Sequence, residues 1–294
     1  MSNRPINRRN FIGSAALGSM SALALDAQTS NTPNASGVKV EKNVAVGKSG
    51  DVELSCDIYR PPAGTEKHMA LIHFHGGALM AGSKDTLGAK VTPITARGYV
   101  SIAAQYRLAP KYKWPAMLED AKIHVHWVRE HANQLGIDPN RIGLAGYSAG
   151  GQIALYTSSL PEEKIAACVG FYPETGVGGL ANMVMPPGSD QAAIEDTDPV
   201  NHIKAGFPPT IVFHGLADVT IPPENSFRLL KALRDAKVHS ELHTFDGVPH
   251  EFDSHPEFAD ACASLTDFFL EREVLHPRTY PPFNFGRPRR NRKE

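Results

Sequence analysis

The serine at position 148 lies in a run of residues that is typical of a nucleophile. The run GYSAGG occupies residues 146–151, directly after an apolar stretch at 142–145 and directly before a helical pattern at 149–158. A strand, a tight Gly-x-Ser-x-Gly turn and a helix make up a nucleophile elbow, in which glycines leave room for the turn. The pattern predicts that the Ser148 hydroxyl stands at a helix N-terminus, where the helix dipole favours developing negative charge.

Two later segments supply a base and an acid. Asp218 ends the run HGLAD, and His250 lies in the run GVPHEF; each run follows a late strand. A serine hydroxyl is a poor nucleophile until a base takes its proton, and a carboxylate fixes the tautomer of that base. The order Ser148, Asp218, His250 is the order used on α/β sheets of this kind. Asp246 and Glu251 are alternatives for the acid, but only Asp218 ends a strand in the expected place.

A glycine pair follows an earlier apolar strand. The run HFHGGA occupies residues 73–78 and includes Gly76 and Gly77. A tetrahedral intermediate needs donors aimed at its oxyanion, and residues without bulky side chains let backbone N–H groups approach it. We therefore expect Gly76, Gly77 and Ala149 to form an oxyanion hole.

The remaining histidines and the cysteines do not form a metal-binding pattern. His124 and His126 are two residues apart on a helix and diverge, and His250-Glu251 lacks the second histidine of an HExxH site. His243 lies within a strand, where a neutral core or edge histidine is expected. The three cysteines show no CxxC spacing, and Cys168 lies in an apolar run as a small core residue. The sequence thus predicts catalysis without a metal or another cofactor.

Composition and charge narrow the class of protein. The chain has 294 residues, of which 41% are hydrophobic and 21% charged, as in globular proteins. Residues 1–26 and 277–294 hold nine of the 30 basic side chains and two of the 31 acidic ones, which leaves a net charge of −8 on the rest. An acidic body argues against a nucleic-acid partner, because phosphate contacts need clustered Lys and Arg.

The elements that must position these groups alternate along the chain. Residues 38–46 and 51–59 alternate apolar with polar side chains around a turn, which predicts an antiparallel hairpin. The later strands are nearly continuous apolar runs, as expected of parallel strands covered on both faces. They are expected at 69–74, 99–105, 142–145, 165–171 and 210–214, with helices at 85–97, 116–134, 149–158, 224–235 and 257–273. This alternation predicts an α/β fold with a mostly parallel, doubly wound sheet and helices on both faces.

The segments before and after these alternating strands and helices define the expected limits of the folded domain. Residues 1–27, with Arg8-Arg9 before a short apolar stretch, resemble a bacterial twin-arginine signal, which implies a periplasmic or secreted protein; a frayed amphipathic N-terminus is the alternative. A polar linker at 28–37 then leads to a domain at 38–275, and a basic Pro/Arg-rich tail follows at 276–294. No segment is long and apolar enough to be an integral membrane anchor.

Residues 174–197 interrupt the domain with Gly, Pro and apolar side chains, and no strand or long helix fits there. We expect an irregular insertion, for which a small lid is one form. Loops of this kind stand over the carboxyl ends of the strands, where α/β sheets bind ligands. Its Met183 and Met185 offer adaptable apolar contacts and are therefore candidates for binding substrate.

Taken together, the motifs resemble those of a known family. From about residue 51 to 270 the chain resembles the α/β-hydrolases of the hormone-sensitive-lipase-like and acetyl-esterase group, in which HGG, GxSxGG, HGxAD and a late PHxF recur. The run YRLAP at 106–110 is similar to a largely structural segment of that group. The resemblance implies the α/β-hydrolase fold and ester hydrolysis by Ser148, Asp218 and His250.

Two departures from the family pattern bear on the substrate. Ala78 stands where many members have Gly, and Tyr147 where the lipase-like branch commonly has Asp. In both features the chain resembles small bacterial esterases, including acetyl-xylan and feruloyl esterase-like enzymes. The resemblance therefore implies short acyl or aryl esters as substrates. Tyr147 is accordingly a third candidate for substrate contact.

The predicted activity is acyl transfer through a covalent intermediate on Ser148, with a small-molecule or carbohydrate-linked ester as substrate. Two alternatives stay open. The run HGLADVTIPPENS also resembles the catalytic domain of prolyl-oligopeptidase-like peptidases, which implies amide hydrolysis. A catalytically silent hydrolase fold used for binding is the second, although the intact Ser, Asp and His set argues against it. The oligomeric state is not indicated by the sequence.

Overall fold

The computed structural model describes residues 37–281. The expected signal at 1–27, the linker up to residue 36 and the tail from residue 282 lie outside the described residues.

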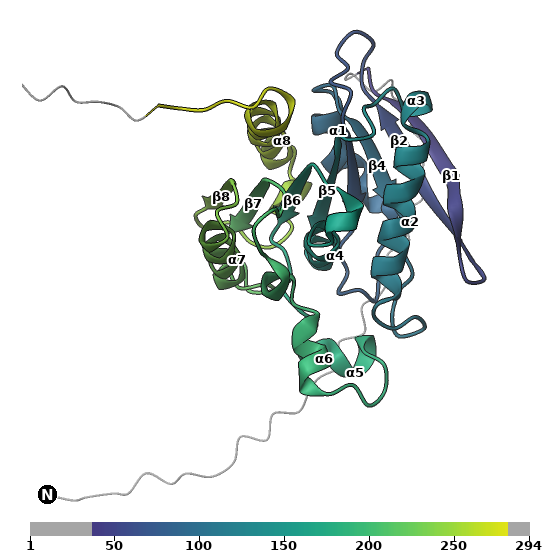
Figure 1. Cartoon of the computed structure of the whole chain (residues 1–294), viewed down its shortest axis with the longest axis vertical. Coiled ribbons are helices and arrows are strands. Elements are labelled where there is room, and N and C mark those ends of the chain that lie inside the picture. The colour runs from purple at the N-terminus through teal and green to yellow at the C-terminus, as the bar shows by residue number, and fades with distance from the viewer. Residues whose placement is uncertain (1–36, 282–294) are drawn as a thin grey trace, which may run out of the picture. The chain divides into compact units, whose positions relative to one another are not determined.

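Within this range the strands form a single sheet in the order β1-β2-β4-β3-β5-β6-β7-β8 (Figure 1). The strands are β1 (Lys39–Ser49), β2 (Val52–Arg60), β3 (Ala70–Phe74), β4 (Val100–Ala104), β5 (Ile142–Tyr147), β6 (Ala167–Phe171), β7 (Thr210–Gly215) and β8 (Ser240–Phe245). β1 and β2 form the expected antiparallel hairpin, and β2 pairs antiparallel with β4. All other neighbours pair in parallel.

Helices cover both faces of the sheet, as the alternating pattern predicted (Figure 1). The longer ones are α1 (Gly88–Thr95), α2 (Ala116–Glu130), α4 (Ala149–Ser158), α7 (Glu224–Asp235) and α8 (Pro256–Leu270), with shorter turns η1 (Lys84–Leu87), α3 (Ala132–Leu135), η2 (Pro161–Glu163), η4 (Pro199–His202), η5 (Phe252–Ser254) and a π-helical turn η6 (Glu271–Leu275). α2, α4 and α7 bury their apolar side chains in one core, and α1 and α8 bury theirs in another.

The strands contribute to the two cores by alternation. In β3, Ile72 and Phe74 belong to the core under α2 and α4, whereas Leu71 belongs to the core under α1 and α8. Successive side chains of a strand point to opposite faces of the sheet. Every residue of β3 is therefore buried, and this is why the central strands appear in the sequence as continuous apolar runs.

The segment at 174–197 is more regular than expected. It contains three short helices, η3 (Gly178–Leu180), α5 (Ala181–Val184) and α6 (Gln191–Asp196). Asp190 caps α6 by accepting a hydrogen bond from the Ala193 N–H at 2.8 Å. The prediction that no strand or long helix fits there is confirmed, whereas the expectation of irregular chain was wrong in part, because helices of three to six residues are too short to show a periodic pattern. Figure 1 shows the segment standing apart from the helices that cover the sheet.

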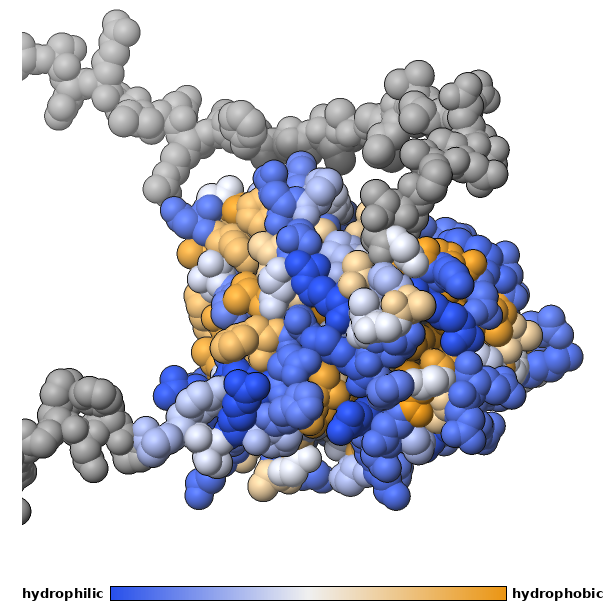
Figure 2. Space-filling model, turned by 90° about the horizontal axis from the view of Figure 1, so that it is seen from above, coloured by the Kyte–Doolittle hydropathy of each residue, from blue (hydrophilic) through white to orange (hydrophobic). Residues whose placement is uncertain are grey.

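The face of the molecule seen in Figure 2 is mainly polar. Hydrophilic side chains cover most of the face seen in Figure 2, and smaller apolar areas lie between them. Val219 and Phe268 are large apolar side chains that are well exposed, at 94% and 60%. Among residues 37–281, none of the helices has the length and hydrophobicity needed to cross a membrane.

Two histidines are buried in the cores and should make stability depend on pH. Burial lowers the pKa of His73 to about 3 and that of His124 to about 4. Between the unfolded value of about 6.5 and these values, only the unfolded chain binds the protons, so acid favours unfolding. We expect the free energy of unfolding to fall by about 3 kcal/mol between pH 6.5 and pH 5 from these two residues.

Denaturant unfolding at several pH values measures this loss. His124→Gln should reduce the slope by about half, because one of the two protons no longer binds. An unchanged slope in that variant would mean that other groups cause the acid sensitivity.

Candidate active site

The sequence folds Ser148 into a strained turn between β5 and α4. Its backbone angles are φ 54° and ψ −121°, which is rare for a residue with a side chain. The Ser148 N–H donates to the Phe171 carbonyl at 3.0 Å, and its carbonyl accepts the N–H groups of Gly151 at 2.8 Å and Glu174 at 3.0 Å. The ends of two strands and the first turn of α4 therefore hold the serine in place.

The flanking glycines are required by close backbone contacts. A Cβ at Gly146 would lie 2.1 Å from the Gly150 oxygen, and a Cβ at Gly150 would lie 2.1 Å from the Phe74 oxygen. No side chain fits at such distances. The expected reason for the GxSxG spacing is thus confirmed: Gly146 lies against the first turn of α4, and Gly150 lies against the end of β3.

The carboxyl end of the sheet also brings His250 and Asp218 together. The Nδ1 of His250 donates to Asp218 Oδ2 at 2.6 Å, and Asp218 Oδ1 accepts the N–H groups of Thr220 and Ile221 at 2.9 Å each. With its proton on Nδ1, the imidazole leaves Nε2 free to accept one. The alternative acids Asp246 and Glu251 are both exposed, and neither pairs with His250.

His214 is a site residue whose role the sequence reasoning missed. Its Nε2 donates to the Ile221 carbonyl at 2.9 Å, its Nδ1 accepts from Ser226 Oγ at 2.6 Å, and Nε2 lies 3.4 Å from Asp218 Oδ2. Burial lowers its pKa, which favours the neutral form of the ring. His214 closes the loop around Asp218. In the sequence, only its place at the start of the HGLAD run could have indicated this structural role beside Asp218.

The glycine pair at the end of β3 is held by a second buried histidine. His75 Nδ1 donates to the Gly76 carbonyl at 2.7 Å, and the ring stacks on Tyr106, with centroids 4.2 Å apart. A peptide carbonyl and the following N–H point in opposite directions, so fixing the Gly76 carbonyl also fixes the direction of the Gly77 N–H. A Cβ at Gly76 would lie 3.2 Å from the Ser148 Cβ, which places the pair directly against the elbow.

The three amides expected to form the oxyanion hole are available as donors. Within residues 37–281, the N–H groups of Gly76, Gly77 and Ala149 have no backbone acceptor outside the regular elements. Gly77 and Ala149 line a cavity that Ser148 and His250 also line, whereas Gly76 is not among the lining residues. This position suits donors that must meet a negative oxygen formed next to the serine.

The cavity at the elbow has a volume of about 480 Å³. Its walls come from the elbow, the glycine loop, the residues after β6 and the loops that carry Asp218 and His250. The lining residues are Gly77, Ala78, Leu79, Ser148, Ala149, Gln152, Glu174, Gly176, Val177, Leu180, Val184, Thr220, Ile221, His250 and Glu251. The segment at 174–197 thus does contribute to the cavity.

The three candidates for substrate contact, Tyr147, Met183 and Met185, do not line this cavity. Met183 is 42% exposed, and Met185 is buried in the core under α2 and α4. Val177 and Val184 form the apolar wall instead, because the short helices turn them inward. Tyr147 belongs to the core under α1 and α8, because its side chain points to the face of β5 that these helices cover.

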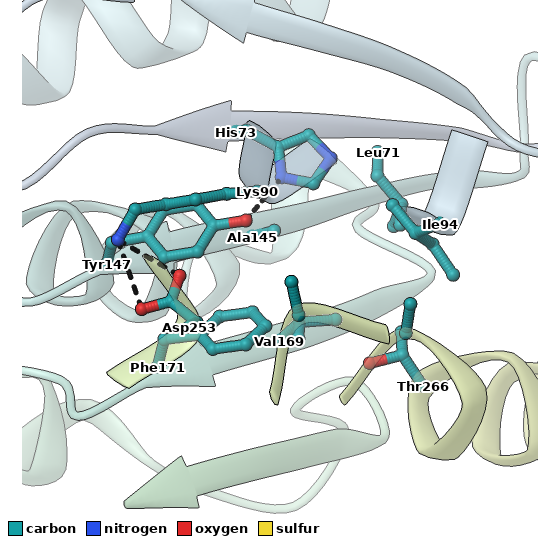
Figure 3. Close-up of a pocket in the computed structure, with 12 residues that line it drawn as sticks. Leu71, His73, Lys90, Ile94, Ala145, Tyr147, Val169, Phe171, Asp253 and Thr266 are labelled. Atoms are coloured by element: carbon teal, nitrogen blue, oxygen red, sulfur yellow. Dashed lines mark hydrogen bonds and ion pairs between the residues drawn. The ribbon is translucent and has the colours of Figure 1, made fainter. Parts of the chain in front are cut away.

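Tyr147 lines a small pocket of about 20 Å³ on the α1 side of the sheet (Figure 3). Lys90 of α1 lies 3.0 Å from Asp253 there, and its ammonium lies 5.0 Å from the centre of the Tyr147 ring. The Tyr172 hydroxyl also donates to Asp253, and the Tyr172 ring packs against His250 at 4.4 Å. The buried pair of Lys90 and Asp253 therefore ties the loop that carries His250 to α1.

Lys90→Met should destabilise the protein by about 3–5 kcal/mol, because it leaves the Asp253 charge buried without its partner. The double variant Lys90→Met with Asp253→Asn should recover part of that loss, since no charge then remains. Denaturant unfolding of both variants measures the difference. Equal stability of the two would show that the unpaired carboxylate is not the cause.

The side chains that could bind a metal ion are dispersed in the described part of the chain, and its cysteines are unpaired. Among the residues that the structure describes, no group of three or more His, Cys, Asp or Glu side chains is placed to hold a metal ion. Cys56, Cys168 and Cys262 are free and buried. Burial raises the pKa of Cys168 to about 12, which fits its expected role as a core residue.

Comparisons with known proteins agree with this geometry. The BD-FAE family matches residues 56–177. The apo form of Thermogutta terrifontis esterase 2 has a TM-score of 0.67 and 30% sequence identity, over 80% of this chain and 94% of that chain. Esterase LipC and carboxylesterase NlhH of Mycobacterium tuberculosis are each 30% identical, over 64% and 62% of this chain. The chain spans only 54% of LipC and 58% of NlhH.

The sheet and the nucleophile elbow define an α/β-hydrolase. The chain is also similar to Thermogutta terrifontis esterase 2 over almost the full length of that esterase. It therefore belongs to the hormone-sensitive-lipase-like esterases of this fold. The family resemblance expected from the motifs is thus confirmed.

Proposed function

We propose that this protein is a serine hydrolase of carboxylic esters that acts on short-chain acyl or aryl esters through an acyl-enzyme. One observation carries the proposal: Ser148, on its strained elbow, lines the same cavity as His250, which is hydrogen-bonded to Asp218. A hydroxyl, a base and a carboxylate in this arrangement are what nucleophilic acyl transfer requires.

The reaction begins when Ser148 Oγ attacks the ester carbonyl carbon and His250 Nε2 takes the hydroxyl proton. The oxyanion that forms accepts hydrogen bonds from the N–H groups of Gly76, Gly77 and Ala149. The ester C–O bond then breaks, and His250 gives its proton to the departing alcohol. Water attacks the acyl-enzyme with His250 as base, which releases the acid and restores the serine.

The loop contacts of Asp218 support its role in this cycle. Asp218 accepts two backbone N–H groups through one oxygen and His250 through the other, so its carboxylate is fixed before substrate binds. An imidazole held in one orientation needs little rearrangement when it takes the proton, and the carboxylate stabilises the cation that forms. His214 positions this loop and does not reach the reacting atoms.

The cavity supports a short acyl chain. Leu79, Val177 and Leu180 provide an apolar wall, and the volume of about 480 Å³ is at the lower end of the range for small-molecule sites. Structures of Thermogutta terrifontis esterase 2 include butyrate-bound and propionate-bound forms, and a form phosphorylated by paraoxon. We propose a similar preference here, for a small-molecule or carbohydrate-linked ester.

A panel of p-nitrophenyl acetate, butyrate and octanoate, a feruloyl ester and a p-nitroanilide tests the proposal. We expect turnover of the acetate and butyrate above the octanoate, no turnover of the anilide, and covalent labelling by a fluorophosphonate. Cleavage of the anilide at a comparable rate would favour the peptidase alternative. Absence of both ester turnover and labelling would favour the silent binding protein.

A further inference from the structure

Glu174 places a carboxylate in the wall of the cavity. The residue follows β6 after Pro173, and its N–H donates to the Ser148 carbonyl at 3.0 Å, so its main chain is fixed directly to the elbow. Its side chain is partly buried, and burial raises the pKa of its carboxyl group. The proposed hydrolysis does not use this group.

Within residues 37–281, no cation forms a direct ion pair with Glu174, although Arg228 and His250 lie close enough to act on its charge. One carboxylate oxygen accepts the Thr175 N–H at 3.0 Å, and that is its only hydrogen bond within residues 37–281. The nearby Arg228 is engaged elsewhere, with Asp198 at 2.6 Å and the Thr175 hydroxyl at 2.8 Å. A partly buried carboxylate without a direct ion pair is costly, and a ligand that brings a donor offsets that cost.

The rest of the cavity lining also favours a ligand that brings a hydrogen-bond donor or a positive charge. Neither Lys nor Arg is among its lining residues, and the second charged group there, Glu251, is also acidic. Apart from Ser148, His250 and the neutral polar side chains Gln152 and Thr220, the residues that line the cavity are apolar or acidic. A concave site lined by one sign of charge attracts ligands of the opposite sign and repels those of its own.

We propose that Glu174 is a specificity-determining residue that selects esters carrying a hydrogen-bond-donating group in the acyl or alcohol part, with ammonium preferred to hydroxyl. This inference rests on the proposed ester hydrolysis. The carboxylate accepts a charge-assisted hydrogen bond from an ammonium group and a weaker one from a hydroxyl group. Esters that carry a carboxylate are rejected by like-charge repulsion.

Pairs of esters with the same shape test the preference. The ammonium arm compares 2-(dimethylamino)ethyl butyrate with 3-methylbutyl butyrate, and the hydroxyl arm compares 2-hydroxyethyl butyrate with propyl butyrate. A third pair, ethyl 3-hydroxybutyrate and ethyl 3-methylbutyrate, moves the donor to the acyl part. Acid release at about pH 7.5, about three units above the ordinary glutamate pKa of about 4.3 and so with room for the raised pKa of Glu174, gives kcat/KM for each ester.

In the wild-type protein the ammonium ester should exceed its carbon partner by about tenfold, and a hydroxyl ester should exceed its methyl partner by a smaller factor. Glu174→Gln should bring the ammonium ratio close to one. The glutamine keeps an acceptor for the Thr175 N–H, so the variant removes the charge without removing that local contact. Glu195→Gln, an exposed site on α6 outside the cavity, is the matched control and should keep the wild-type ratio.

The outcomes separate this inference from the proposed function. If the carbon partners and p-nitrophenyl acetate are hydrolysed but the wild-type ammonium ratio is one or lower, the inference fails and ester hydrolysis stands. The same holds if Glu174→Gln folds and leaves the ratio unchanged. If none of the esters is hydrolysed, both the function and the inference are overturned.

Discussion

Ser148→Ala is expected to lower ester turnover by about a millionfold and to abolish fluorophosphonate labelling. The reason is that the hydroxyl is the atom that bonds to the acyl group, and no other hydroxyl or thiol among the residues lining the cavity stands on the elbow. Turnover of p-nitrophenyl acetate and the labelled fraction are the measurements. The fold should persist, because Ser148 Oγ makes no hydrogen bond within residues 37–281.

Ser158→Ala is the matched control for this loss. Ser158 lies at the end of the same helix, α4, is 5% exposed and does not line the cavity. It should keep both labelling and turnover. Thermal unfolding of both variants checks that they remain folded. If Ser148→Ala retained a tenth of the wild-type rate, the nucleophile would have to be another residue.

Asp218→Asn is expected to lower turnover by about ten-thousandfold. An asparagine can still accept the N–H groups of Thr220 and Ile221 through its oxygen, so the loop should keep its shape. Its amide group, however, would donate to His250 Nδ1. The imidazole proton would then sit on Nε2, which could no longer accept the proton of Ser148.

The other two candidate acids provide the comparison for Asp218. Asp246→Asn and Glu251→Gln each remove one exposed carboxylate near His250 in sequence, and each should change kcat by much less than Asp218→Asn. Substrate turnover at saturating ester, with unfolding curves for all three variants, decides the assignment. A large loss in Asp246→Asn together with a nearly silent Asp218→Asn would assign the acid to Asp246.

Local constraints explain why the sequence alone predicted the elbow and the fold class. The GxSxG turn needs glycine at 146 and 150 because the backbone of the neighbouring strand and helix lies within 2.1 Å of any Cβ there. Such a steric requirement is visible in a few adjacent residues. The central strands were equally visible, since helices on both faces bury every residue of β3.

Pairs that are far apart in the chain were only partly predictable. The order of Ser148, Asp218 and His250 follows from where loops leave a parallel sheet, so the three were expected at one edge. Whether Asp218 or a nearby carboxylate reaches His250 depends on the path of the loop. Backbone donors to Asp218 and the buried ring of His214 decide that path, and none of them is apparent from spacing.

The sequence by itself therefore determined the α/β class, the family and the types of groups that gather at the carboxyl edge of the sheet. Only the tertiary structure decided which side chains form the cavity wall. Met183 and Met185 have suitable chemistry but are turned away by helices of a single turn, whereas Glu174 is held in the wall by its hydrogen bond to Ser148. The physical reason is that a tight turn is specified by neighbouring residues, but a cavity is made where segments distant in sequence meet, and small rotations of the backbone select which side chains face it.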